Sequence, residues 1–130
     1  MADKKTRYSI PSGVKEEARK GRTLRTMHGY GGGKVTKAIN YRLRVQKDVG
    51  YRTAVKIDTY YRRHEDVDPK GENFDNRKRP SKGLIMWKMM GGNSGHSWSR
   101  RLKKSLDVIQ KAERLNKINQ TLEEIHGMVR

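Results

Sequence analysis

Apolar residues recur along this chain at intervals of three and four, which is the spacing of one face of an α-helix. Proline, glycine or serine interrupts the pattern between successive stretches and marks where helices begin and end. The pattern predicts five helices, over residues 12–28, 34–46, 51–64 and 82–90 and from residue 93 or 94 to near the end. The predicted inward-facing positions of the first three are Val14, Ala18, Leu24, Met27, Val35, Ala38, Ile39, Leu43, Ala54, Ile57 and Tyr61. We therefore expect an all-α fold, a compact bundle of about five helices with a long C-terminal helix projecting from it.

The segment from residue 80 to residue 98 is an apolar island that holds both tryptophans. Ser81 is predicted to cap its short helix, as Ser12 is for the first helix, and glycines are predicted to end both. Apolar side chains surround most of the short helix, so we expect it at the centre of the domain. Trp87 and Trp98 lie on apolar stripes and are interpreted as core residues rather than as surfaces that stack on bases.

The apolar stripe of the last helix changes phase near Ala112. Beyond that point it follows a short heptad seam, predicted to dock on a partner and formed by Leu115, Ile118, Leu122, Ile125 and Val129. The expected organisation is a flexible basic arm over residues 1–10, a helical domain over 11–109 and an extension helix over 110–130. The extension is expected to associate with a partner or with another copy of the chain.

Charge adds a functional expectation to this outline. The chain has 31 lysines and arginines against 14 acidic residues, a net charge of +17, and its hydrophobic share of 32% leaves a small core. This balance favours nucleic acid, with DNA first, as a partner bound through backbone phosphates. The basic helices lack the aromatic or leucine-rich face that a membrane surface would need, no apolar run reaches membrane-spanning length, and residues 1–10 do not form a secretory signal. We therefore expect no membrane association and no secretion, and the absence of cysteine excludes disulfides and thiolate metal sites.

The predicted nucleic-acid-binding residues are cations on or beside the polar faces of the first three helices. They are Arg19, Lys20, Arg22, Arg25, Lys34, Lys37, Arg42, Arg44, Lys47, Arg52, Lys56, Arg62 and Arg63. Tyr30, Tyr41 and Tyr51 are interleaved with them and are candidates for stacking on bases.

Three short motifs invite other chemistry. His64, Glu65 and Asp68 are types that bind divalent metals, but we interpret them as a helix end followed by a solvated acidic loop. Pairing of this cluster with Arg62, Arg63 or Arg77, which would hold the loop, is the alternative. Three glycines before Lys34 lack the spacing of a nucleotide-binding loop, so either a flexible connector or a turn that holds one phosphate is expected. The turn at residues 93–96 lacks a nucleophile motif. No catalytic residue, metal or cofactor is assigned.

Four motifs resemble a small module found in tailed-bacteriophage and prophage genomes, alone or attached to head-morphogenesis proteins. They are IPSGVKEEARKG at residues 10–21, HGYGG at 28–32, YYRRHE at 60–65, and PSKGLIMW with GGNSGHSW over 80–98. Met90 and Asn93 depart from the pattern, which has tryptophan and often aspartate there. The resemblance implies a phage origin, a location in the virion or the host-cell cytoplasm, and no particular chemistry.

The resulting hypothesis is a non-enzymatic, virion-associated phage structural protein that binds nucleic acid in the head or neck or during capsid assembly. Phage structural proteins and a second copy of the chain are further expected partners. A structural adaptor that docks on capsid, portal or tail proteins without nucleic acid is the alternative. A metal-dependent nuclease using His64, Glu65 and Asp68 is a third.

Overall fold

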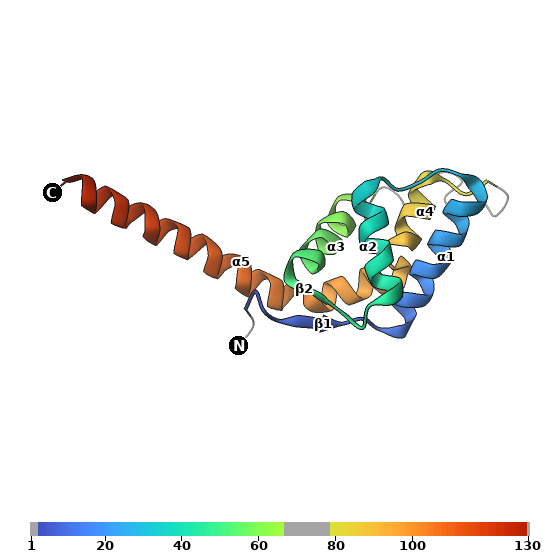
Figure 1. The fold of residues 1–130 in the computed structure, drawn as a ribbon, viewed down its shortest axis with the longest axis horizontal. Coiled ribbons are helices and arrows are strands. Elements are labelled where there is room, and N and C mark those ends of the chain that lie inside the picture. Colours follow the sequence, from blue (N-terminus) through green and yellow to red (C-terminus); the bar gives the residue numbers. More distant parts are fainter. Residues whose placement is uncertain (1–2, 67–78, 130) are drawn as a thin grey trace.

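The computed structural model describes residues 3–66 and 79–129, the last without its side chain. In chain order the elements are β1 (Arg7–Ser9), α1 (Ser12–His28), α2 (Lys34–Val45), β2 (Asp48–Gly50), α3 (Tyr51–His64), α4 (Lys82–Met89) and α5 (Gly92–Val129). Four helices and the first part of α5 pack together, and the rest of α5 projects from this body (Figure 1). The predicted all-α bundle with a long C-terminal helix is confirmed.

Two helix ends follow local chemistry that the sequence indicates. Gly29 ends α1 with a left-handed φ of 73°, and its N–H donates to the carbonyl of Arg25 at 2.8 Å. Ser81 caps α4, because its Oγ accepts from the N–H of Leu84 at 3.0 Å. The prediction that Ser12 caps α1 is wrong: the N-cap residue is Pro11, and no side chain caps this helix end.

The predicted flexible arm over residues 1–10 is wrong for its second half. β1 pairs antiparallel with β2, so that Tyr8 lies opposite Val49. Tyr8 and Ile10 alternate with exposed residues and are both buried, which gives this segment an inward face. The Tyr8 hydroxyl also lies 2.9 Å from Ser105 Oγ of α5. Burial of two large side chains therefore fixes a segment that charge alone suggested would be loose.

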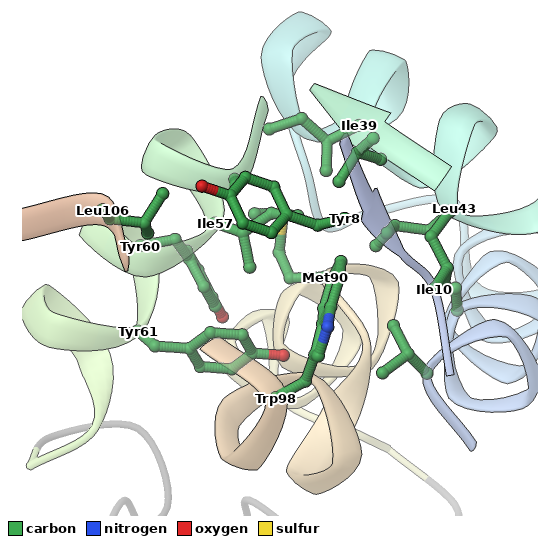
Figure 2. Packing of buried hydrophobic residues seen from close by; sticks show 14 of the residues in the cluster. Tyr8, Ile10, Ile39, Leu43, Ile57, Tyr60, Tyr61, Met90, Trp98 and Leu106 are labelled. Carbon is green, nitrogen blue, oxygen red and sulfur yellow. The ribbon is translucent and has the colours of Figure 1, made fainter. Parts of the chain in front are cut away.

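The core gathers side chains from every element around Tyr61, Met90 and Trp98 (Figure 2). Trp87 and Trp98 are 3% and 4% exposed, which confirms that both are core residues. The apolar stripe of α5 is buried at Leu106 and Ile109.

Some predicted inward positions are wrong. Met27 and Val35 are largely exposed, and so is Ala38. The buried face of α2 is rotated by about one residue and consists of Thr36, Ile39, Asn40 and Leu43. The rotation follows from Asn40, whose hydrogen bonds require it to face inward. Among the described residues, no helix is both long enough and apolar enough to cross a bilayer.

Candidate nucleic-acid interface

A basic groove runs along the junction of α2 and α3. It consists of adjoining hollows of about 730, 210 and 270 Å³, and Lys56 lines all three. Arg42 and Thr53 are shared by the first two hollows, and Val35, Ile39 and Lys56 by the last two. We call this surface the α2–α3 groove and define it by the cations that α2 and α3 contribute, which are Lys34, Arg42, Arg52, Lys56 and Arg63. Lys4 and Arg7 of the N-terminal segment also line the largest hollow.

Helical spacing places these cations on both sides of the groove. On α3, Arg52, Lys56 and Arg63 are separated by four and seven residues and therefore share one face. On α2, Lys34 and Arg42 are eight residues apart and also share a face. The side of α2 that was wrongly predicted to be core thus forms part of the groove, and Val35 contributes apolar surface beside Lys34.

The cations that α2 and α3 contribute to the groove have no acidic partner among the described residues, whereas Arg7 in the largest hollow pairs with Asp48 at 2.7 Å. Within the part of the chain that the structure describes, none of the five forms an ion pair. The two smaller hollows are lined by no acidic residue among those described. Glu113 lines the largest hollow, but its carboxylate already pairs with Lys4 Nζ at 3.3 Å. The guanidinium of Arg42 is held in place by the buried Thr53, whose Oγ1 accepts from it at 3.1 Å.

A second basic cluster lies where α1 meets α2. Arg44 donates from Nε to Asn40 Oδ1 at 2.8 Å, and its Cζ lies 5.8 Å from the ring centre of Tyr41. Partial burial and the nearby charge of Arg22 both lower the pKa of Arg44. The cluster therefore holds two like charges close together, with an exposed aromatic ring beside them, and an anion bound there would relieve their repulsion.

Other residues of the predicted basic set have structural partners. Lys20 lies 3.6 Å from Glu16 and 3.7 Å from Glu17. Arg62 pairs with the buried Asp58 at 2.6 Å and lies 3.6 Å from Asp107 of α5. Arg25 donates to the carbonyl of Gly31 at 2.8 Å. Arg19, Lys37 and Lys47 are exposed and line none of the three hollows.

Two of the three candidate tyrosines are unsuited to stacking on bases. Tyr51 is buried, and the half-buried Tyr30 donates its hydroxyl proton to the carbonyl of Pro80 at 2.5 Å. Tyr41 is the exposed one, at 57%. All three lie among basic residues in the sequence, but only Tyr41 has a ring exposed enough to stack on a base.

The glycine turn before α2 is packed at Gly31. Gly31 has a φ of 95°, and a Cβ at this position would lie 2.7 Å from Cγ2 of Ile85 in α4. The turn is also held by the hydrogen bond from Arg25 to Gly31. Gly31 is therefore held against α4, whereas Gly29 and Gly33 at the two ends of the turn have no neighbour within 4 Å of an added Cβ.

Glu65, the residue that follows α3, connects the end of α3 to α5. Glu65 accepts hydrogen bonds from Arg100 and lies 2.7 Å from His96 Nε2, both on α5. These bonds, with that from His96 first, hold the pKa of Glu65 below its ordinary value, against the opposing effect of burial. The alternative pairing of Glu65 with neighbouring arginines is replaced by this contact. His64 stacks on Tyr60 with ring centres 4.6 Å apart.

This geometry gives no support to a nuclease centre. Asp68 and Arg77 lie outside the described residues. Among the residues that are described, no group of three His, Asp or Glu side chains is arranged to hold a metal ion. Glu65 is committed to the helix contact rather than available as a ligand.

Sequence reasoning missed Asn40, which joins three helices. Its Nδ2 donates at 2.9 Å to the carbonyls of Ala18 in α1 and of Met89 at the end of α4. Its Oδ1 accepts from Arg44, so the residue connects the core to the second basic cluster. A polar residue in the middle of an apolar stripe was the available signal.

The predicted docking seam lies on the projecting part of α5. Leu115, Ile118, Leu122 and Ile125 are each about half exposed, and the side chain of Val129 lies outside the described residues. No protein-family model, curated protein or solved structure matches the chain. The charge and geometry of the chain itself are therefore what indicate its function.

Proposed function

We propose that the protein is a non-enzymatic phage structural protein that binds nucleic acid, DNA in the first place, through backbone phosphates in the α2–α3 groove. The observation that carries this proposal is the groove itself, with five cations on two helices and no ion pair to a described acid. Phosphates would supply the missing negative charge and would release their condensed counterions on binding.

The dimensions of the groove suit a nucleic-acid strand. From Arg52 to Arg63 the α3 wall extends about 16 Å, at 1.5 Å per residue. That length corresponds to about five phosphates along one strand of a duplex, at 3.4 Å of axis per phosphate. Contacts made by lysine and arginine to phosphates carry no base information, so we expect binding that tolerates any sequence.

The setting of this activity is part of the proposal. The resemblance to a phage module supports a role in the virion head or neck, or during capsid assembly, beside other phage structural proteins. A strongly basic protein with a sequence-tolerant phosphate surface suits contact with packaged DNA, where every sequence must be accommodated.

The test measures binding to a random-sequence DNA duplex by fluorescence anisotropy over a range of salt concentrations. For wild type, the logarithm of the affinity should fall linearly with the logarithm of salt. Replacing Lys56 and Arg63 together by alanine should reduce that slope by about 2 and weaken binding about tenfold or more. The matched control replaces Lys103 and Lys104, which are exposed on α5 and line none of the three hollows.

An equal loss in both double variants would contradict the groove, since net charge alone would then govern binding. Salt-independent affinity would rule out the phosphate mechanism altogether. Preference for an acidic polypeptide over DNA would instead favour the structural adaptor, in which the same cations meet an acidic protein surface.

A further inference from the structure

The projecting part of α5 has little support from the rest of the described chain, since only its first turns border Asp3–Lys5, through a hollow that Asn116, Lys117 and Gln120 also line. Lys4 pairs with Glu113 at 3.3 Å where the helix leaves the body, and every residue from 114 to 128 is exposed. Leu115, Ile118, Leu122 and Ile125 nevertheless form one apolar stripe with alternating three- and four-residue spacing. This is the spacing of a coiled-coil seam rather than of scattered surface residues.

We propose that this stripe is covered by the same segment of a second copy of the chain, running antiparallel. The register that brings Ile118 opposite Leu122 of the second copy also brings Leu115 opposite its Ile125. All four apolar positions are then covered by apolar positions. The contact is isologous, as expected for a twofold dimer.

Charge within the segment favours the antiparallel direction. Lys111, Arg114 and Lys117 make its first half positive despite Glu113, whereas Glu123 and Glu124 make its second described half negative. Antiparallel pairing brings the positive half of one copy beside the negative half of the other. Parallel pairing would bring like charges together at both ends.

The charge of the whole chain favours the same direction. Each copy carries a net +17, and most of this charge lies in the body rather than in the projecting helix. Two parallel helices would bring the two bodies side by side at the base of the pair. Antiparallel helices place the bodies at opposite ends, separated by roughly 20 helical residues or about 30 Å. That distance exceeds the screening length of about 8 Å at physiological salt, so the repulsion between the bodies largely disappears.

The seam is short, but the helix that carries it is stabilised because its first part is anchored in the core. An isolated helix of this length would be marginal because nucleation is costly. Here the first part of α5 is already fixed in the core through Trp98, Leu106 and Ile109, so the projecting part only has to extend an existing helix. We expect a reversible dimer with a Kd of roughly 10–100 μM.

Sedimentation of the full chain at increasing concentration tests the association. Wild type should shift from monomer to dimer, and Leu122→Glu should weaken the dimer by at least about 100-fold, because the substitution enters the interface twice. Gln120→Glu is the charge-matched control, since it lies on the opposite face of the helix, and should dimerise like wild type. A wild-type chain that stays monomeric at about 0.5 mM would overturn the proposal, as would an unchanged dimer in Leu122→Glu.

Disulfide trapping tests the direction, and the absence of native cysteine makes single-cysteine variants unambiguous. Leu115→Cys mixed with Ile125→Cys should give a cross-linked heterodimer under mild oxidation. Leu115→Cys alone should cross-link poorly, since its two sulfurs would lie about ten residues, or about 15 Å, apart along the helices. Efficient cross-linking of Leu115→Cys to itself would show parallel pairing and overturn the antiparallel arrangement.

Discussion

Asn40 shows how one side chain can determine which face of a helix is buried. At 2% exposure it contributes two N–H donors, one to Ala18 and one to Met89. The carbonyl of Met89 belongs to the last turn of α4 and has no partner within that helix, so Asn40 supplies a donor that the fold would otherwise lack. This requirement turns α2 and sends Val35 outward into the groove.

Asn40→Asp should destabilise the fold by about 3 kcal/mol, because both donors are lost and a carboxylate would face two carbonyl oxygens. The shape of the side chain is unchanged, so the loss reports on hydrogen bonding rather than on packing. Urea unfolding followed by circular dichroism measures it. Asn119→Asp makes the same change at an exposed position and should stay within about 0.5 kcal/mol of wild type. Equal stability of the two variants would contradict the role given to Asn40.

The lowered pKa of Glu65 predicts that the stability of the fold depends on pH. Its pKa is lower in the folded chain than its ordinary value near 4.3, so its ionised form stabilises the fold above that value. The contribution is lost as pH falls from there through the folded pKa. Glu65→Gln should therefore be less stable than wild type at pH 7, and the difference should shrink as the pH falls below about 4.3.

Thermal unfolding across this pH range measures the difference. Glu16→Gln is the control, since that carboxylate is 67% exposed and lies 3.6 Å from Lys20. A difference between Glu65→Gln and wild type that did not change with pH would show that the contacts of Glu65 do not depend on its charge.

At the scale of the elements, α1 and α4 approach each other closely at Gly21. A Cβ added to Gly21 would lie 2.3 Å from the backbone nitrogen of Met89, and backbone atoms cannot move aside as a flexible side chain can. Glycine is used here because the two helices need to touch, even though it weakens the interior of α1.

Gly21→Ala should therefore destabilise the fold by about 2 kcal/mol or more, although helix propensity alone would predict a gain of about 1 kcal/mol. Gly127→Ala is the matched control, because nothing lies within 4 Å of the Cβ it would add to α5. It should increase helicity without loss of stability. A stabilising effect of Gly21→Ala would show that α1 and α4 can separate at little cost.

The elements also show what the sequence could predict. The bounds of α3, the cap at Ser81 and the burial of both tryptophans follow from local patterns, and the structure confirms them. The pairing of β1 with β2 could not be predicted, since three-residue strands are too short for a periodic signal and their contact spans about 40 residues. The rotation of α2 could not be predicted from the sequence either, because it depends on hydrogen bonds from Asn40 to carbonyls of α1 and α4.

At the scale of the whole molecule, the sequence predicted an excess of cations but not how they are distributed. Composition could not distinguish Lys56, which lines a groove, from Arg62, which is held by Asp58. Their separation depends on which side of α3 meets α5, a property of tertiary packing. The candidate interface therefore contains fewer cations than the predicted basic set. Substituting a cation of the groove should weaken nucleic-acid binding more than substituting a cation elsewhere on the surface, although both remove one charge.

The packing of α1 on α4 and α5 also has a consequence for the order in which the chain is made. Residues 1–64 contain 17 lysines and arginines and are synthesised before the helices on which α1 rests. Until residues 82–98 have left the ribosome, this polycation has no core to fold onto, so residues 1–64 cannot reach this fold before then. The groove consequently forms only after residues 82–98 are present, and a fragment ending after α3 would bind phosphates as an unfolded polymer rather than as this surface.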